Sequence, residues 1–125
     1  MPFILVVDEE PMILELIAIV LRNAGFSVLT ANTTSEALAL KRQYSDEIKL
    51  LITDASLPQT DGPTLAERLM ALDPSLSVLF LSATTIESDV TRQKRSGFLA
   101  KPFNPEELLA KAKALITGSY VLTAR

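Results

Sequence analysis

The sequence contains no cysteine and no histidine among its 125 residues. The absence of cysteine excludes disulfides, thiol catalysis and thiolate metal sites. The absence of histidine excludes a Ser-His-Asp triad and imidazole metal ligands. It also means that this chain cannot donate a phosphoryl group from a histidine of its own.

Glycine is scarce as well. The four glycines are Gly25, Gly62, Gly97 and Gly118. Their spacing builds neither a G-x-G-x-x-G fingerprint nor a P-loop, so ordinary dinucleotide and nucleotide triphosphate sites are not expected. The apolar run at residues 12–21 is interrupted by Glu15 and is too short to span a bilayer. The N-terminus lacks the basic residues of a signal peptide. We therefore expect a cytoplasmic protein with no membrane partner.

The composition is that of a globular domain. Hydrophobic residues make up 48% of the chain and charged residues 22%, and the length is typical of one domain. The formal net charge of -3 argues against binding of a nucleic acid backbone as the main role.

Short apolar runs alternate with longer stretches of helical periodicity. Strands are expected at residues 3–7, 26–30, 49–53, 77–81 and 98–100, and helices at 11–24, 34–44, 64–72, 86–95 and 105–116. Ser35 or Thr34 is the expected cap of the second helix, Asn104 caps the last helix, and Gly118 is its expected stop. This alternation predicts one α/β domain at 3–116, with a parallel sheet covered on both faces and a tail or linker at 117–125.

Polar side chains follow the predicted strands. Asp8 and Glu9 follow the first, Asp54 the third, Ser82 the fourth and Lys101 the fifth. Ligands of open α/β sheets bind at this carboxyl edge, so these groups are expected to converge there. Three carboxylates stay ionised together only around a cation, and oxygen ligands without sulfur or imidazole indicate Mg²⁺ or Mn²⁺.

Such a site suits phosphoryl transfer. Asp54 is the best candidate for a nucleophile that forms an acyl phosphate, because a buried strand holds its backbone. Lys101 would add a positive charge and Ser82 a hydrogen-bond donor. Taken singly, each residue has an ordinary alternative: acids at a helix start, a turn-forming Asp, a loop Ser and a surface Lys. Their coincidence at one sheet edge favours the site.

Four segments, ILVVDEEP, LLITDASLPQTDG, VLFLSA and FLAKPF, occur in this order. In these segments the chain resembles the response-regulator receiver domains of two-component signalling, over residues 3–116. The resemblance implies a flavodoxin-like (βα)5 fold with strand order 2-1-3-4-5. It implies a sensor histidine kinase or a histidine phosphotransfer protein as partner. The segments GPTLAERL and FLAKPFNPEELLAK also resemble receivers at the C-terminus of hybrid sensor histidine kinases.

The resemblance also assigns roles around the metal. Asp54 matches the phospho-accepting aspartate. Asp8 and Glu9 match the acidic pair that holds Mg²⁺, and Ser56 would supply a backbone carbonyl ligand. Ser56 and Thr84 fall where the family tunes the lifetime of the phosphoryl group.

Further roles concern the response to phosphorylation. Lys101 matches the lysine that binds the phosphate and is often followed by a cis proline, here Pro102. Ser82 matches the hydroxyl that moves toward the phosphate. Phe98 matches the aromatic switch residue, although an aromatic on a short strand is also ordinary core packing.

The sequence departs from the family in two ways. Between Ser82 and Lys101 it is shorter than usual, by about one helical turn, which alters the face of the fourth helix. We therefore expect a monomer or a weak homodimer. The segment at 86–95 has few apolar anchors and several weak helix formers, so we expect it to be loosely packed and mobile. No DNA-binding effector follows the receiver in this sequence, so direct nucleic acid binding is not expected.

Two other functions compete with the phospho-acceptor. A phosphatase of the haloacid dehalogenase type needs a second Asp two residues after its nucleophile, where this chain has Ser56, and a cap domain. A purely structural receiver would normally have lost an acid or the lysine, and none is lost here. The apolar helix at 12–21 is either deeply covered or an exposed patch that docks a partner helix bundle.

Overall fold

The chain folds into a five-stranded parallel sheet in a computed structural model, which describes residues 2–55, 61–82 and 96–124, with side chains up to residue 117. The strands are β1 (Phe3–Val7), β2 (Ser27–Ala31), β3 (Ile48–Asp54), β4 (Ser77–Ser82) and β5 (Ser96–Ala100). Their order is β2-β1-β3-β4-β5, with every pairing parallel. The predicted fold class and strand order are confirmed.

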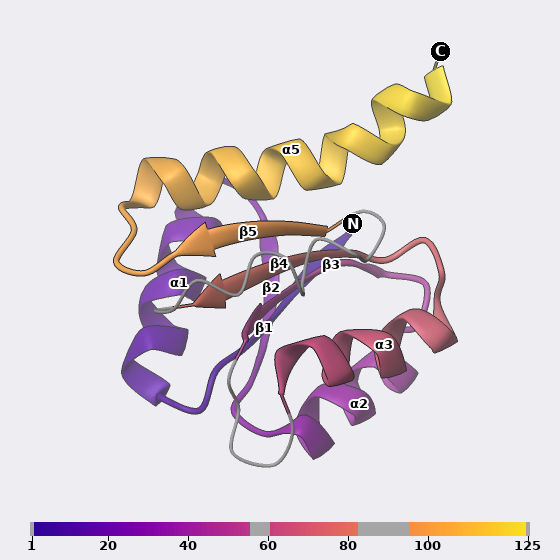
Figure 1. Cartoon of the computed structure of the whole chain (residues 1–125), viewed down its shortest axis with the longest axis horizontal. Helices are drawn as coiled ribbons and strands as arrows, with labels where there is room; N and C mark the ends of the chain where they lie inside the picture. The colour runs from indigo at the N-terminus through magenta and orange to yellow at the C-terminus, as the bar shows by residue number, and fades with distance from the viewer. Residues whose placement is uncertain (1, 56–60, 83–95, 125) are drawn as a thin grey trace.

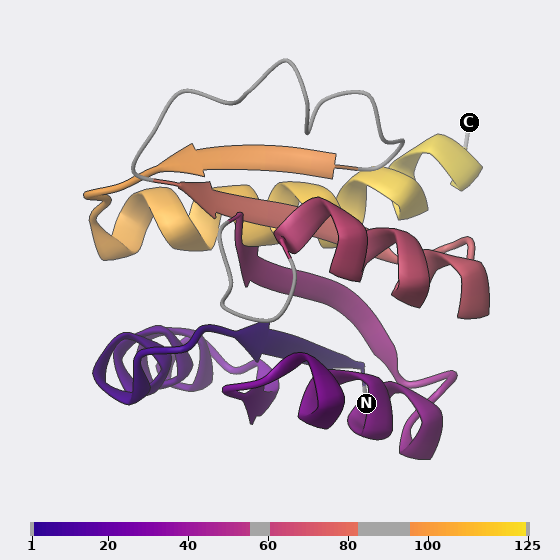
Figure 2. The same ribbon diagram turned by 60° about the horizontal axis from the view of Figure 1, so that its bottom comes forward.

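Helices cover both faces of the sheet. They are α1 (Pro11–Asn23), α2 (Thr34–Gln43), α3 (Gly62–Leu72) and α5 (Pro105–Ala124). Figures 1 and 2 show α1 and α5 on one face and α2 and α3 on the other. The predicted helix at residues 86–95, with its expected mobility, lies outside the described residues.

Side chains of each strand alternate between two apolar cores. In β1, Ile4 and Val6 belong to the core beneath α1 and α5, whereas Leu5 and Val7 belong to the core beneath α2 and α3. All four are at most 1% exposed. Because both faces are covered, the strands are continuous apolar runs rather than alternating ones. The strand ends are therefore rigidly held.

One helix cap and one helix start lie upstream of their predicted positions. The cap of α2 is Thr33, whose side chain accepts from the N–H of Glu36, and not Ser35 or Thr34. Helix α3 starts at Gly62 instead of residue 64, because Asp61 caps it by accepting from the N–H of Thr64. In both helices, the capping side chain accepts a hydrogen bond from the N–H three residues later, and the helix begins directly after the capping residue.

Helix α5 runs past its predicted stop. Asn104 caps it as expected, in reciprocal hydrogen bonds with Glu107. However, the helix continues through Gly118 to Ala124, so the predicted end at residue 116 is wrong. One glycine inside a helix costs only about 1 kcal/mol, which does not end it. At the end of α1, Gly25 has a φ of 98°, the left-handed conformation in which glycine commonly ends a helix.

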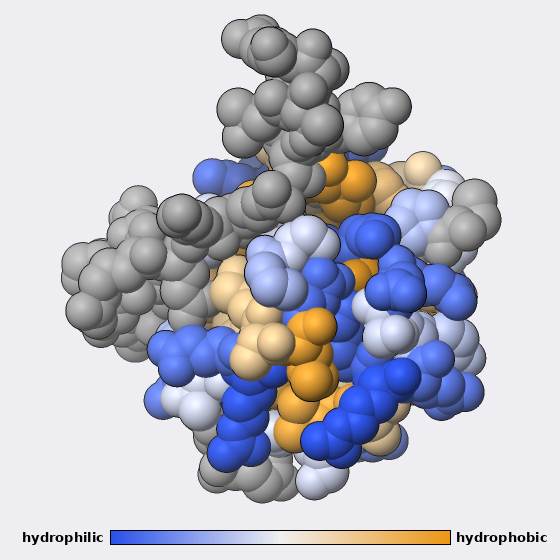
Figure 3. All heavy atoms as spheres, turned by 90° about the vertical axis from the view of Figure 1, so that its right-hand side faces the viewer, coloured by the Kyte–Doolittle hydropathy of each residue, from blue (hydrophilic) through white to orange (hydrophobic). Residues whose placement is uncertain are grey.

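The end of the molecule where the strands begin is mostly polar. Figure 3 shows hydrophilic side chains dominating this face around a narrow strip of hydrophobic ones. Among the described residues, no helix is long and apolar enough to cross a membrane.

Candidate functional site

The carboxyl ends of four strands bring the predicted residues together. Asp54 is the last residue of β3 and Ser82 the last of β4, while Asp8 follows β1 and Lys101 follows β5. Backbone hydrogen bonds extend the sheet into the site: the N–H of Asp8 donates to Ala31, and that of Lys101 donates to Ser82. The predicted convergence at one sheet edge is confirmed for these four residues.

Lys101 lies between two carboxylates. Its Nζ is 2.7 Å from Oδ2 of Asp54 and 3.7 Å from Oδ2 of Asp8. Burial alone would lower the pKa of Lys101, but its hydrogen bond to Asp54 and the charges of both aspartates raise that pKa above its ordinary value. Lys101 is therefore a permanent positive charge beside the carboxylate of Asp54.

Asp8 is the most deeply placed acid of the site. It is 2% exposed, and its Oδ2 has no hydrogen-bond partner among the described residues. Its Oδ1 accepts from the N–H of Glu10 at 2.9 Å. Burial raises the pKa of Asp8, and the Glu10 N–H and the Lys101 charge offset this only in part. A buried carboxylate oxygen without a donor favours a cation at this position.

The structure gathers two of the three predicted carboxylates. Asp8 and Asp54 share Lys101, whereas Glu9 is exposed. In the part of the chain that the structure describes, no three acidic side chains are grouped closely enough to hold a metal ion. The expected meeting of all three is therefore not seen among the described residues, where Lys101 lies between Asp8 and Asp54. The oxygen donors of Asp8 and Asp54 still fit a hard divalent ion. Ser56, the predicted carbonyl ligand, lies outside the described residues.

Asp8→Asn is expected to stabilise the metal-free protein by about 1 kcal/mol, because the substitution removes a buried charge whose Oδ2 accepts no hydrogen bond from the described residues. Lys101 would keep its closer partner, Asp54. Urea unfolding in excess chelator would measure the change, with the exposed Glu9→Gln as control. A variant less stable than the wild type would contradict this account of Asp8.

The two predicted switch residues differ in burial. Ser82 is 5% exposed. Phe98 is partly buried, packs against the core beneath α2 and α3, and pairs in register with Phe80 of β4. Its packing agrees with the ordinary core role and leaves the switch role a prediction. The Lys101–Pro102 peptide bond is cis, as the resemblance implied, and Thr84 lies outside the described residues.

Two residues near the site were not singled out from the sequence. Glu10 orients Asp8 through its N–H, and its charge acts on both Asp8 and Lys101. The acidic run at residues 8–10 was the available signal. Gly62 packs against the backbone of Asp54. The sequence feature that could have pointed to Gly62 is a glycine directly before the proline of the third helix.

Helix α1 carries an exposed apolar patch beside the site. Met12, Leu16 and Ile19 are 78%, 58% and 44% exposed, so the alternative of a deeply covered helix is wrong. The patch continues into a hollow of about 520 Å³ between α1 and the start of α5. The hollow is lined by Ile13, Leu16, Ile17, Val20, Lys101, Pro102, Phe103, Pro105 and Leu108. Apolar surface therefore reaches from α1 to Lys101.

Comparison with known proteins gives a consistent result. The sequence model of the response regulator receiver domain matches residues 4–113. The chain is 35% identical over 114 residues to the DNA-binding response regulator MtrA of Mycolicibacterium smegmatis, covering 89% of this chain and 49% of that protein. It is 36% identical over 121 residues to the DNA-binding dual master transcriptional regulator RpaA of a Synechocystis species, covering 93% and 49%. The chain thus spans about half the length of these curated relatives.

Solved structures agree with the sequence comparison. A response regulator receiver domain protein from Clostridium thermocellum superposes with a TM-score of 0.88 at 25% identity, covering 98% of this chain and 99% of that one. The receiver domain of the hybrid histidine kinase CckA superposes with a TM-score of 0.80 at 30% identity, covering 91% and 98%.

Proposed function

Since the chain belongs to the response regulator receiver domain family, whose members act in two-component signalling, we propose that Asp54 is its phospho-acceptor. The phosphoryl group would come from a histidine of a sensor kinase or a phosphotransfer protein. The observation that carries the proposal is the carboxylate of Asp54 at the end of β3, held 2.7 Å from the ammonium of Lys101 with Asp8 beside it.

The reaction needs one bond formed and one broken. A carboxylate oxygen of Asp54 attacks the phosphorus atom, an O–P bond forms, and the N–P bond to the donor imidazole breaks. The imidazole nitrogen keeps the electron pair and takes a proton from solvent. Lys101 stabilises the negative charge on the transferred group, because its ammonium already lies beside the attacking carboxylate.

The metal site would be formed by Asp8, Glu9 and Asp54 together with the backbone carbonyl of Ser56. Mg²⁺ bound there would neutralise phosphoryl oxygens, and Mn²⁺ has the same ligand preference. The buried Oδ2 of Asp8, which accepts no hydrogen bond from the described residues, supports this assignment. A CheX-CheY-BeF3-Mg²⁺ complex from Borrelia burgdorferi shares the fold, with a TM-score of 0.83 at 22% identity.

Phosphorylation would be read out by Ser82 and Phe98. Ser82 ends β4, and its carbonyl accepts from the N–H of Lys101 at 2.8 Å. Phe98 lies on the adjacent strand β5, so a shift of Ser82 toward the phosphate has a short path to it. Ser56 and Thr84 would tune the phosphoryl lifetime.

The exposed apolar patch of α1 would receive the phospho-donor. A helix of the donor that packs on Leu16 and the adjoining hollow would place its histidine next to Lys101 and Asp54, because Leu16 and Lys101 line the same hollow. We propose a monomer or a weak homodimer in the cytoplasm, with no nucleic acid bound directly by these residues.

The test is incubation with Mg²⁺ and acetyl phosphate, followed by measurement of the intact mass. We expect one labile phosphoryl group per chain. Continuous phosphate release from many monoesters would instead support the haloacid dehalogenase type of phosphatase. No change in mass would support a structural receiver and would contradict the proposal.

Removal of the metal should stop the reaction. In excess chelator we expect no phosphorylation, because the charge of the incoming phosphoryl group would meet the carboxylates of Asp8 and Asp54. Among the described residues, Lys101 is the one basic side chain paired with them. Mass measured over time with and without chelator checks this, and added Mg²⁺ should restore the reaction. Phosphorylation at the full rate in chelator would contradict a metal requirement.

A further inference from the structure

Gly62, the first residue of α3, lies against the backbone of Asp54. A Cβ at this position would be 2.9 Å from Cα of Ala55, 3.2 Å from the carbonyl carbon of Asp54, and closer still to the carbonyl oxygen of Asp54. Real Cβ atoms essentially never come within 3.0 Å of such atoms. Among the described glycines only Gly25 has a left-handed φ. The requirement for glycine at 62 is therefore one of space.

Neither side of this contact has a flexible group that could move away. The N–H of Gly62 donates to the carbonyl of Ala55 at 3.0 Å, and the N–H of Ala55 donates to the carbonyl of Leu81 in β4 at 2.8 Å. On the other side, α3 is anchored by Leu65 and Leu69, both 0% exposed. An added methyl group must therefore displace the backbone of Asp54 and Ala55 or the start of α3.

Gly97 provides an internal comparison. A Cβ at Gly97 would be 3.1 Å from Cδ1 of Leu115 and 3.5 Å from Cδ1 of Leu79. Both atoms are ends of side chains that can change rotamer, whereas the atoms facing Gly62 are backbone. An added methyl group would therefore face side chains that can move at position 97, but backbone that cannot move easily at position 62.

We propose that Gly62 is a positioning residue for phosphorylation. Because Gly62 has no side chain, the backbone of Asp54 can pack directly against it, and in this position the carboxylate of Asp54 contacts Lys101. The inference rests on the proposed function of Asp54. Lys101 Nζ and Asp54 Oδ2 are 2.7 Å apart, so a small displacement of the Asp54 backbone would lengthen this hydrogen bond. A misplacement of about 1 Å costs catalysis on the order of a hundredfold.

The test compares Gly62→Ala with Gly97→Ala. Initial rates of phosphorylation are measured over a range of acetyl phosphate concentrations at saturating Mg²⁺. Each rate is divided by the concentration of folded protein. For Gly62→Ala we expect the saturating rate to fall by ~10- to 100-fold, with little change in half-saturation. Amide shifts of Asp54, Ala55 and Lys101 should move, while those of α1 stay. Gly97→Ala should keep the wild-type rate.

All assays are run in concentrated sucrose, which favours the folded state. Wild-type rates for a folded Gly62→Ala would overturn the inference, as would a variant that stays unfolded in sucrose, because Gly62 would then serve the fold as a whole. Equal losses in both variants would also overturn it. If the wild type itself gains no phosphoryl group, the proposed function of Asp54 is wrong. If the wild type is phosphorylated and Gly62→Ala is phosphorylated at the same rate, only the inference about Gly62 is wrong.

Discussion

Asp54→Asn is expected to abolish acyl-phosphate formation while leaving the fold intact. An amide has the shape of the carboxylate but is not a useful nucleophile. The substitution lies at the end of β3, after a run of fully buried residues, so the strand stays in place. Lys101 would lose its partner at 2.7 Å and keep Asp8 at 3.7 Å. Intact mass after incubation with Mg²⁺ and acetyl phosphate measures the effect.

A matched control is Asp46→Asn, which removes the charge of an exposed aspartate away from the carboxyl ends of the strands. We expect this control to be phosphorylated at the wild-type rate. If Asp54→Asn gained a stable phosphoryl group as fast as the control, the assignment of the phospho-acceptor would be wrong.

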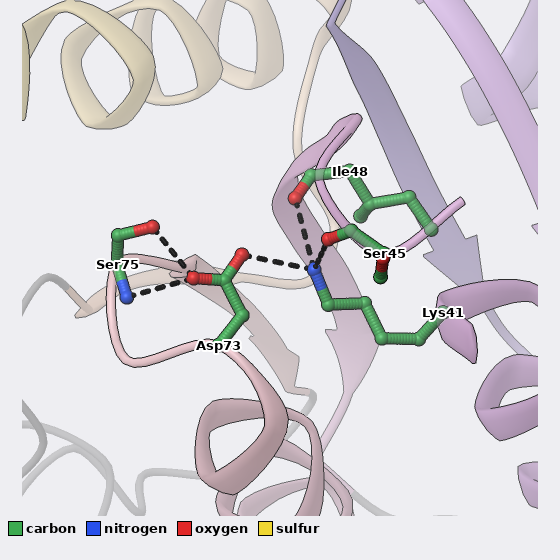
Figure 4. A network of polar contacts seen from close by, with 5 residues as sticks. All are labelled: Lys41, Ser45, Ile48, Asp73 and Ser75. Carbon is green, nitrogen blue, oxygen red and sulfur yellow. Dashed lines mark hydrogen bonds and ion pairs between the residues drawn. The ribbon is translucent and has the colours of Figure 1, made fainter. Parts of the chain in front are cut away.

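The second large effect concerns the stability of the fold and a lysine outside the site. Lys41 of α2 is fully buried. Its Nζ donates to the carbonyls of Ser45 and Ile48 and forms an ion pair with Oδ2 of Asp73 at 2.9 Å (Figure 4). Asp73 is the C-cap of α3, and its Oδ1 accepts from both the N–H and the hydroxyl of Ser75. This network joins α2 to the turn between α3 and β4.

Asp73→Asn is expected to destabilise the protein by about 3 kcal/mol, because a buried ammonium loses its counter-charge. The midpoint of thermal unfolding should fall by roughly 10 °C. Asparagine keeps an acceptor for Ser75, so the change is mainly one of charge. Thermal and urea unfolding check the prediction, again with Asp46→Asn as the control. A loss no larger than that of the control would contradict it.

Adding Lys41→Met to Asp73→Asn should recover most of the lost stability. With both charges gone, this network holds no unpaired ion, and an apolar side chain of similar length replaces the lysine. The pair of single variants and the double variant form a cycle that isolates the ion pair. A double variant less stable than Asp73→Asn would contradict this, because it would show that Lys41 stabilises the fold through its backbone hydrogen bonds even without the ion pair.

The same network has a defined pH dependence. Partial burial would raise the pKa of Asp73, but the hydrogen bonds from Ser75 and Lys41 hold this pKa below its ordinary value. A lowered folded-state pKa means that the stabilisation is present above the unfolded-state pKa and is lost as the pH falls through the folded-state value. The stability difference between wild type and Asp73→Asn should therefore shrink in acid.

The sequence predicted the sheet and most of the site for a physical reason. Strands buried on both faces are plain apolar runs, and a parallel sheet brings their carboxyl ends to one edge. Asp8, Asp54, Ser82 and Lys101 could thus be placed without coordinates. The position of Glu9 could not, because which of two adjacent acids turns inward depends on side-chain packing.

Element ends were harder to predict than the elements themselves. Gly118 looked like a helix stop, yet α5 passes through it, because a glycine ends a helix only where the backbone also changes direction. Lys41 fell at helical spacing among apolar residues, but its partner Asp73 lies 32 residues away. Gly62 stood within the quoted motif, and only the backbone packing around it reveals the contact with Asp54.

The most direct test of the central claim is chemical mapping of the phosphorylated residue. Borohydride reduces an acyl phosphate to the alcohol, so an aspartyl phosphate becomes homoserine, which peptide mass spectrometry locates. After treatment with Mg²⁺ and acetyl phosphate, we predict homoserine at position 54 and at no other acid. Reduction at Asp8 or Glu9, or no reduced residue in any peptide, would contradict the assignment of Asp54 as the phospho-acceptor.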